Sequence, residues 1–159
     1  VGKYPVRVIK AMNKVVKNVE EFADLEMEEF LPIDKNDGRF LSDTICYNAC
    51  KIAEQVDAKA VMTMTHSGYN AFKIASFRPP SKICIFTNNH KIMNTLSLLW
   101  GVRGYYYDSF ASTDDTMAEI KNIIQEKGII EKGDLVVNIA SMPITEKGMT
   151  NMLKLSCVE

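Results

Sequence analysis

Between Ala60 and Ala140, short apolar runs alternate with segments of helical periodicity, and this alternation limits the folds open to the chain. The apolar runs read "AVMTM", "ICIF", "YYY" and "LVVNIA", and the helical patterns cover Tyr69–Phe77, Lys91–Leu99 and Thr116–Glu126. Short, nearly continuous apolar strands separated by helices are typical of a parallel sheet that helices cover on both faces. The pattern therefore predicts an α/β fold with three layers, α/β/α.

The last segment, "TNMLKLSCV", has a different pattern, because Leu153, Leu155 and Cys157 alternate with more polar neighbours. Such alternation is typical of a half-exposed edge strand. The preceding connection, "SMPITEKGM", is too short for a crossover helix, so the final strand should run antiparallel to its neighbour. We expect a sheet of about five strands, mostly parallel, with the last strand antiparallel.

The first part of the chain predicts a separate amphipathic helix over Lys3–Asp24, with Pro5 in a first turn that tolerates it. Its continuation, "EEFADLEMEEFLPIDKNDG", is acidic and ends in turn-forming residues, so we interpret it as a helix end and a linker. The carboxylates have mixed spacing, which favours a solvated face over a metal site. Residues 1–38 thus form a helix and linker, and residues 39–159 form the α/β domain.

A second helix should start at Ser42 or Asp43, because either side chain can cap it, and should run to about Val56. Cys46 and Cys50 lie four residues apart on this helix and could in principle hold a metal ion together. Free cysteine is among the most buried residue types, so small core side chains are the favoured interpretation. With four cysteines and no paired metal-binding spacing, we expect reduced thiols and no metal.

Composition limits the partners of the chain. Its 159 residues carry a formal net charge of -1, so no overall field attracts nucleic acid or an anionic membrane. Apolar runs are too short to span a bilayer, and the start lacks the core of a signal peptide, so we expect a soluble cytoplasmic protein. Trp100 and the tyrosines at 105–107 could stack on bases, but the charge and strand context favour core and sheet packing.

The stretch "THSGYN", from Thr65 to Asn70, follows an apolar strand and opens a helix. Ligands of open parallel sheets bind beyond the carboxyl ends of strands, where helix N-termini offer N–H groups to anions. Thr65 and Ser67 can donate hydroxyl hydrogen bonds, Gly68 allows close approach to the backbone, and Asn70 adds an amide. This indicates an anion site, most simply for phosphate.

A purely structural interpretation stays open for this stretch, since Ser67 can simply cap the helix and Gly68 can simply form the turn. The chain has neither of the glycine-rich phosphate motifs, GxGxxG or GxxxxGK[ST]. His66 could add positive charge below neutral pH, although a lone loop histidine is more often a bystander.

Several motifs, in the same order, resemble the C-terminal domain of pyruvate kinase. The clearest is "TxSG" before a helix, followed by "RP" and an apolar strand, which here involves Thr65, Ser67, Gly68, Arg78 and Pro79. "GKYPV" resembles the segment just after the last strand of that family's catalytic barrel, and "WGV" resembles a "GV" or "GI" before a later strand. "KGDLVV" and "GMTNMLKL" resemble the family's final strand pair, so the resemblance covers essentially the whole chain.

This resemblance implies a regulatory and oligomerisation domain cut from a longer enzyme, with the opening helix belonging to the end of the barrel. The family transfers a phosphoryl group from phosphoenolpyruvate to ADP in glycolysis, and its catalytic residues, with magnesium and potassium, lie on the upstream barrel. We therefore expect no catalytic residues here, no cofactor in this part, an inactive fragment, contacts with the barrel domain, and a homo-oligomer, tetrameric in the full-length enzyme.

The resemblance also implies that the loop at Thr65 to Asn70 holds a phosphate of a sugar-phosphate activator. A second loop, "PITEKGMTN", would fold over the ligand and contribute Lys147, Gly148 and Thr150. Glu146 departs from the sugar bisphosphate pattern, so a monophosphorylated sugar, AMP, sulfate or no effector each remain open.

Two alternatives accompany the regulatory interpretation. The domain could serve assembly alone, with a structural "THSG" loop and an opening helix that drives self-association through its apolar stripe. An independent enzyme with a Cys or His nucleophile is disfavoured, because no Cys and His are placed so that the sequence suggests their pairing.

Overall fold

The structure is a computed structural model, which describes residues 2–22, 34–109, 112–142 and 150–159. The helices are α1 (Pro5–Phe22), α2 (Phe40–Gln55), α3 (Tyr69–Ser76), α4 (His90–Leu96) and α5 (Thr113–Glu126). The strands are β1 (Ala60–Met64), β2 (Lys82–Thr87), β3 (Val102–Tyr106), β4 (Leu135–Ala140) and β5 (Met152–Cys157).

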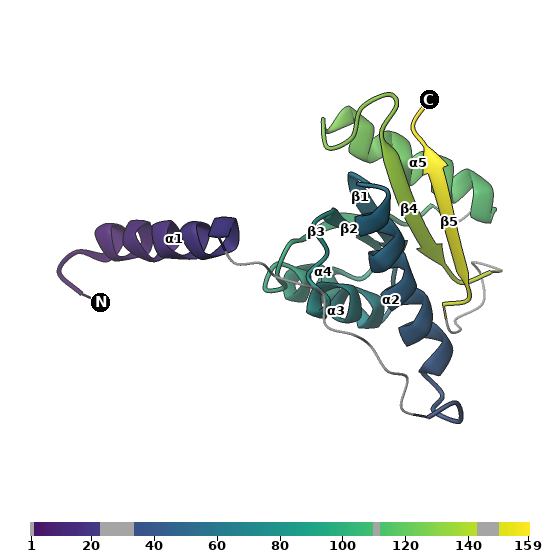
Figure 1. Ribbon diagram of the computed structural model, residues 1–159, viewed down its shortest axis with the longest axis horizontal. Coiled ribbons are helices and arrows are strands. Elements are labelled where there is room, and N and C mark those ends of the chain that lie inside the picture. Colours follow the sequence, from purple (N-terminus) through teal and green to yellow (C-terminus); the bar gives the residue numbers. More distant parts are fainter. Residues whose placement is uncertain (1, 23–33, 110–111, 143–149) are drawn as a thin grey trace.

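The strands form one five-stranded sheet in the order β3-β2-β1-β4-β5 (Figure 1). β1 lies at the centre and pairs in parallel with β2 and β4, with Ala60 opposite Lys82 on one side and Val136 on the other. β3 extends the parallel part, and β5 runs antiparallel to β4. The predicted sheet, mostly parallel with an antiparallel last strand, is confirmed.

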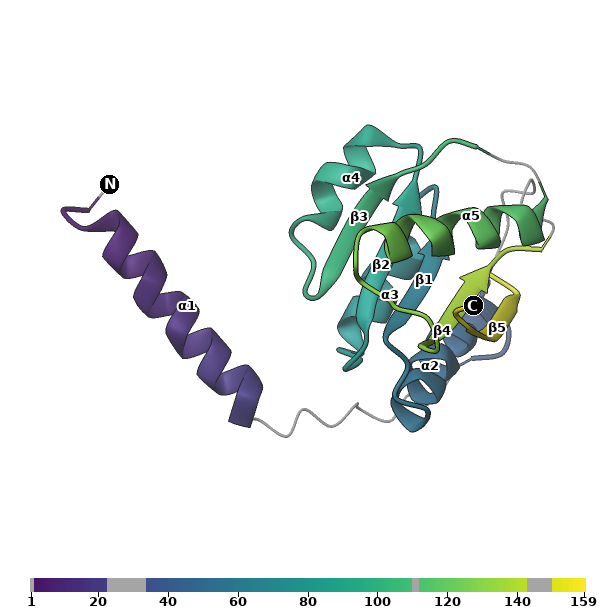
Figure 2. The same ribbon diagram turned by 90° about the horizontal axis from the view of Figure 1, so that it is seen from above.

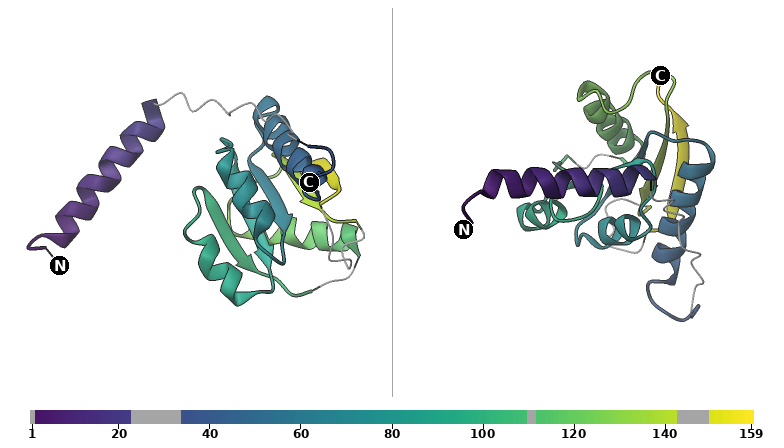
Figure 3. Two further views of the ribbon diagram at one scale, coloured as in Figure 1. Left: turned by 90° about the horizontal axis from the view of Figure 1, so that it is seen from below. Right: turned by 60° about the vertical axis from the view of Figure 1, so that its left-hand side comes forward.

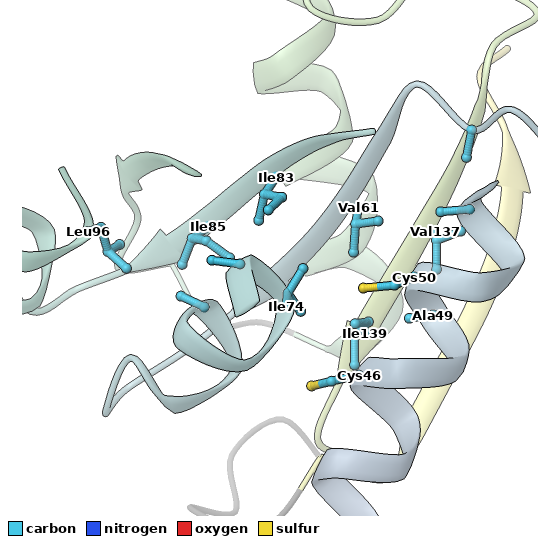
Figure 4. Close-up of a cluster of buried hydrophobic side chains, with 14 residues drawn as sticks. Cys46, Ala49, Cys50, Val61, Ile74, Ile83, Ile85, Leu96, Val137 and Ile139 are labelled. Atoms are coloured by element: carbon cyan, nitrogen blue, oxygen red, sulfur yellow. The ribbon is translucent and has the colours of Figure 1, made fainter. Parts of the chain in front are cut away.

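Helices cover both faces of this sheet, which confirms the predicted three layers. On one face α2, α3 and α4 pack on alternate strand residues, and Figure 4 labels part of this core: Cys46, Ala49, Cys50, Val61, Ile74, Ile83, Ile85, Leu96, Val137 and Ile139. The other face carries Met62, Phe86 and Val136 and packs against Ile120 and Ile124 of α5. In Figure 2, α5 crosses in front of the strands.

Helix α1 projects from the α/β body in Figure 1 and in the left view of Figure 3. It begins at Pro5, where the fixed φ of proline suits a first turn, and none of its described residues is buried. The predicted helix is confirmed over Pro5–Phe22, and the acidic continuation at 23–33 lies outside the described residues.

The start of α2 differs from the prediction. The helix begins at Phe40, and Arg39 occupies the N-cap position without a side-chain cap. Ser42 and Asp43 lie inside the first turn instead, and their side chains bond to residues far away in the sequence. The prediction that one of them caps the helix is wrong because their oxygens serve tertiary contacts.

The aromatic residues near β3 pack partly as expected. Tyr105 stacks on Phe86 at 5.2 Å between ring centroids, and Tyr107 meets the same ring edge-on. Trp100, in contrast, is only half-buried in the turn before β3, so its assignment to the core is wrong. On the edge strand β5, Leu153 packs against the α2 side of the core, whereas Leu155 and Cys157 are exposed.

Candidate functional site

The candidate site lies at the carboxyl end of the central strand. β1 ends at Met64 and α3 starts at Tyr69, so residues 65–68 form the whole connection. The Thr65 N–H donates to the Phe86 carbonyl at 2.9 Å, which ties the start of the loop to the end of β2. The fold thus places this loop where open parallel sheets bind their ligands.

The turn itself depends on Gly68. Its φ of +83° lies in the left-handed region, and an added Cβ would lie 3.4 Å from Ile92 Cγ2. The Gly68 N–H donates to Thr65 Oγ1 at 2.9 Å, and the Tyr69 N–H donates to Ser67 Oγ at 3.3 Å. Gly68 itself occupies the N-cap position of α3, without a side-chain cap, so the interpretation that Ser67 caps the helix is wrong. Thr65 Oγ1 accepts from this N-cap residue and Ser67 Oγ from the first helical residue, and each hydroxyl keeps its O–H to donate elsewhere.

Three buried polar side chains connect α2, α3 and the approach to β5. Asn70 Nδ2 donates to Thr150 Oγ1 at 2.6 Å, and the Thr150 N–H donates to Ser42 Oγ at 3.1 Å. Asn70, Thr150 and Ser42 are each less than a tenth exposed. The structure thus brings the predicted residues Asn70 and Thr150 together as hydrogen-bond partners.

The other predicted site residues differ in accessibility. Ser67 and His66 are exposed at the tip of the loop, whereas Thr65 is buried beneath it. Lys147 and Gly148 lie outside the described residues. Ser67 is therefore the hydroxyl of this loop that faces solvent.

A charged cluster beside the loop was missed by the sequence analysis. The Tyr69 hydroxyl donates to Asp43 Oδ1 at 2.5 Å, Lys73 Nζ lies 2.8 Å from Asp43 Oδ2, and the Arg39 guanidinium lies 4.5 Å from the Tyr69 ring centroid. Burial, followed by the hydrogen bond to Asp43, raises the pKa of Tyr69 to about 12, so the phenol stays protonated. With Lys73 neutralising Asp43, Arg39 leaves the cluster with a net positive charge.

Cys46 and Cys50 are fully buried, which confirms them as core side chains (Figure 4). Burial is the main cause that raises the pKa of each thiol to about 12, and burial also raises the pKa of Cys84 to about 11. These thiols stay neutral and are poor nucleophiles.

The described part of the chain holds neither a metal-binding group nor a membrane-spanning helix. No three His, Cys, Asp or Glu side chains there converge as a metal-binding group. Nor does any helix in the same residues combine the length and apolar character that crossing a bilayer requires.

Comparison with protein families decides the relationship that the motifs suggested. Residues 43–156 match the family described as pyruvate kinase, alpha/beta domain. The chain belongs to the pyruvate kinase family. The matched residues begin in the first turn of α2 and end in β5, so they span the sheet, its covering helices and the candidate site.

Curated relatives extend the match to α1 as well. Pyruvate kinase of Clostridium acetobutylicum is 33% identical over 99% of this chain but over only 33% of its own length. Pyruvate kinase of Geobacillus stearothermophilus is 29% identical over 99% of this chain and 27% of its own length. The chain therefore spans a third or less of these pyruvate kinases.

Solved structures share the fold. Cryptosporidium parvum pyruvate kinase in complex with ADP superposes with a TM-score of 0.68 at 24% identity, covering 75% of this chain and 24% of that one. Another crystal structure of pyruvate kinase from the same organism gives a TM-score of 0.67 at 23% identity, with 75% of this chain and 23% of that one covered.

Proposed function

We propose that this chain is the regulatory and assembly part of a pyruvate kinase whose upstream barrel transfers a phosphoryl group from phosphoenolpyruvate to ADP. Two findings support this assignment: the family match over the α/β body, and the small fraction of each relative that the chain covers. We place the enzyme in the cytoplasm as a homo-oligomer, consistent with its role in glycolysis.

The magnesium and potassium ions of this reaction belong, in our proposal, to the upstream domain. Phosphoryl transfer needs metal-bridged phosphates and cationic clamps. The carboxylates of the described residues do not converge with other metal ligands, so this part of the chain does not fit such a metal site and we assign it no catalytic step.

Within this chain we propose that the loop at Thr65 to Asn70 binds a phosphate group of an effector. The observation that carries the proposal is the accessible Ser67 hydroxyl at the N-terminus of α3, which accepts from the Tyr69 N–H and keeps its own O–H to donate. Arg39 adds positive charge next to Tyr69. An anion at this point is favoured by the helix dipole and by the guanidinium.

Each residue has a distinct part in this proposal. Ser67 donates its hydroxyl to the phosphate, while Thr65 holds the turn through the Gly68 N–H. Asn70 and Thr150 link the loop to the segment that precedes β5, and Lys147 and Gly148 of that segment would close over the ligand. Binding could then shift the assembly, provided that the effector prefers one arrangement of the subunits over another.

The ligand class we favour is a monophosphate, such as a phosphorylated sugar or AMP. The second loop carries Glu146 next to Lys147, so its charges largely cancel. A second phosphate group, as in fructose bisphosphate, would meet the Glu146 carboxylate and be repelled.

A thermal-shift titration tests this proposal, because a ligand that binds only the folded state raises the melting temperature. Fructose bisphosphate, glucose phosphate, ribose phosphate, AMP and sulfate serve as probes. We expect a saturable rise with a monophosphate that Ser67→Ala abolishes and Ser97→Ala, at an exposed serine after α4, leaves intact. A rise unchanged in Ser67→Ala contradicts the proposed cradle.

The alternative function is assembly without an effector. It is favoured by the hydrogen bonds through which Thr65 and Ser67 already hold the turn before α3, to the Gly68 and Tyr69 N–H groups. No shift with any of the probes would support this alternative.

A further inference from the structure

A cavity lies at the amino edge of the sheet, opposite the "THSG" loop. It has a volume of about 340 Å³ and is lined by Pro79, Pro80, Ser81, Lys82, Trp100, Gly101, Val102 and Arg103. The cavity joins the segment before β2 to the turn before β3, so it is separated from the "THSG" loop by the length of the strands. It therefore belongs to neither the candidate effector site nor the core.

The surroundings of this cavity are cationic. Lys82 and Arg103 line it, and the Arg78 guanidinium lies 5.9 Å from the Trp100 ring centroid. Among the described residues, no carboxylate lies within 4 Å of these three cations. Lys82 Nζ already donates to the Ile129 carbonyl at 3.3 Å, and the Arg103 side chain interacts with Tyr105. Arg78, beside the Trp100 ring, is therefore the cation that favours an anionic occupant here.

Arg78 also occupies a backbone position that suits another residue better. It follows the C-terminal end of α3 with a φ of +47°, in the left-handed region that glycine adopts most easily. Arg78 therefore carries a conformational cost, while its guanidinium provides positive charge beside Trp100. The turn alone would favour glycine, so the presence of arginine indicates that its guanidinium has a role.

The end of α1 supplies the complementary charge. Glu20 and Glu21 lie in its last turn, where no basic residue is present and where the helix dipole disfavours carboxylates. Neither carboxylate has an ion pair with a described residue. Trp100 Nε1 donates to Glu20 Oε1 at 3.0 Å, so this acidic turn already reaches the rim of the cavity.

We propose that the cationic cavity at Trp100 is the docking site for the acidic last turn of α1. Glu20 accepts from the Trp100 indole, and the positive charge of Arg78 attracts the two carboxylates electrostatically. The contact fixes where α1 leaves the α/β body and places this junction at the edge of the sheet opposite the "THSG" loop. It does not depend on effector binding.

The test uses the fluorescence of Trp100, which is the only tryptophan in the chain. Iodide is an anionic quencher, whereas acrylamide is neutral. With the turn docked, Glu20 repels iodide from the indole. We expect Glu20→Gln to raise the quenching of Trp100 by iodide more than that by acrylamide, because iodide then enters a cationic cavity.

Glu159→Gln is the matched control. It removes the same charge from an exposed residue after β5, which is the edge strand opposite β3. Its quenching by either reagent should equal that of the unmodified chain. If Glu20→Gln behaves like this control, the docking proposal is wrong.

A second pair of variants tests the cations. Arg78→Gly removes the guanidinium while glycine keeps the left-handed backbone, so the fold should survive. The double variant of Arg78→Gly and Glu20→Gln should show less iodide quenching than Glu20→Gln alone. If the double variant shows the same iodide quenching as Glu20→Gln alone, Arg78 has no role in the cavity. If the effect of Glu20→Gln disappears on dilution, the Glu20 carboxylate at Trp100 comes from a second copy of the chain, and the proposal is wrong.

Discussion

Thr150 is the residue on which the polar interior at the candidate site depends. It accepts from Asn70 through its hydroxyl and donates to Ser42 through its backbone, with almost no access to water. Valine at this position would preserve the shape but leave Asn70 Nδ2 without its acceptor.

We expect Thr150→Val to lower the free energy of unfolding by about 1–3 kcal/mol, the usual cost of an unsatisfied buried polar group. Urea denaturation measures this difference. Thr150→Ser keeps the hydroxyl and should lose less stability. Equal stability of the two variants would mean that the Asn70 contact contributes nothing.

Because of the buried thiols, we expect the free energy of unfolding to fall in alkaline solution. Burial raises the pKa of Cys46 and Cys50 from 9.0 to about 12, so the unfolded chain releases these protons at a lower pH than the folded chain does. Above the thiol pKa of the unfolded chain, the unfolded state binds fewer protons than the folded state. The free energy of unfolding therefore falls as the pH rises toward the thiol pKa of the folded chain.

The free energy of unfolding should decline between about pH 9 and pH 12, and replacing Cys46 with alanine should reduce the slope. Cys157→Ser, at an exposed thiol, should leave the slope unchanged. A slope that is the same in all three proteins would rule out the buried thiols as its cause.

At the scale of the elements, α4 packs tightly against β3 at Gly104. An added Cβ there would lie 3.1 Å from Leu96 Cδ1 and 3.2 Å from Met93 Sδ. We expect Gly104→Ala to destabilise the fold by about 1–3 kcal/mol, as overpacking of a tight core does. Thermal or urea unfolding measures this cost.

Gly38→Ala is the control for that substitution, because no atom lies within 4 Å of a Cβ at Gly38 and its φ is not in the left-handed region. It should leave stability close to that of the unmodified chain. If both variants unfold alike, the contact between α4 and β3 tolerates the extra methyl group.

The elements that the sequence predicted well are those whose signal is local. The bounds of β1 and β4 follow from apolar runs that end at polar or glycine residues, and the "THSG" loop follows from its place between a strand and a helix. The start of α2 was missed because Ser42 and Asp43 are residue types that commonly cap helices. In the fold, Ser42 instead accepts from Thr150, and Asp43 contacts Tyr69 and Lys73, partners that the local sequence does not indicate.

The rest of the site could not be predicted from local patterns. Asn70 and Thr150 lie far apart in the sequence, and only the family resemblance placed them together. The pair of Asp43 and Lys73 joins two helices whose relative position is set by packing, and no spacing in the sequence indicates it. The half-buried state of Trp100 likewise depends on a turn whose neighbours come from α1.

At the scale of the whole molecule, α1 leaves an apolar stripe without cover. Ile9, Met12, Val16 and Val19 lie on one face of the helix and are each more than half exposed. Apolar patches of this kind drive association between proteins. We therefore expect this chain to self-associate through α1.

Light scattering should detect a mass above that of a monomer, and replacing Met12 and Val16 with lysine should bring the mass down to the monomer. Ala11→Lys with Asn18→Lys adds the same charge on a different face of the helix and should preserve the association. A monomeric chain with an ordered α1 would contradict this expectation.

The strand order also has a consequence for how the chain acquires its structure. β1 pairs on one side with β2, which follows it after a short connection. On its other side it pairs with β4, so Ala60 can meet Val136 only when most of the chain is present. Contacts of such high sequence separation slow folding, and an open apolar edge promotes aggregation in the meantime. A nascent chain therefore passes through a half-built sheet, with its central strand exposed until the segment that carries β4 has been synthesised.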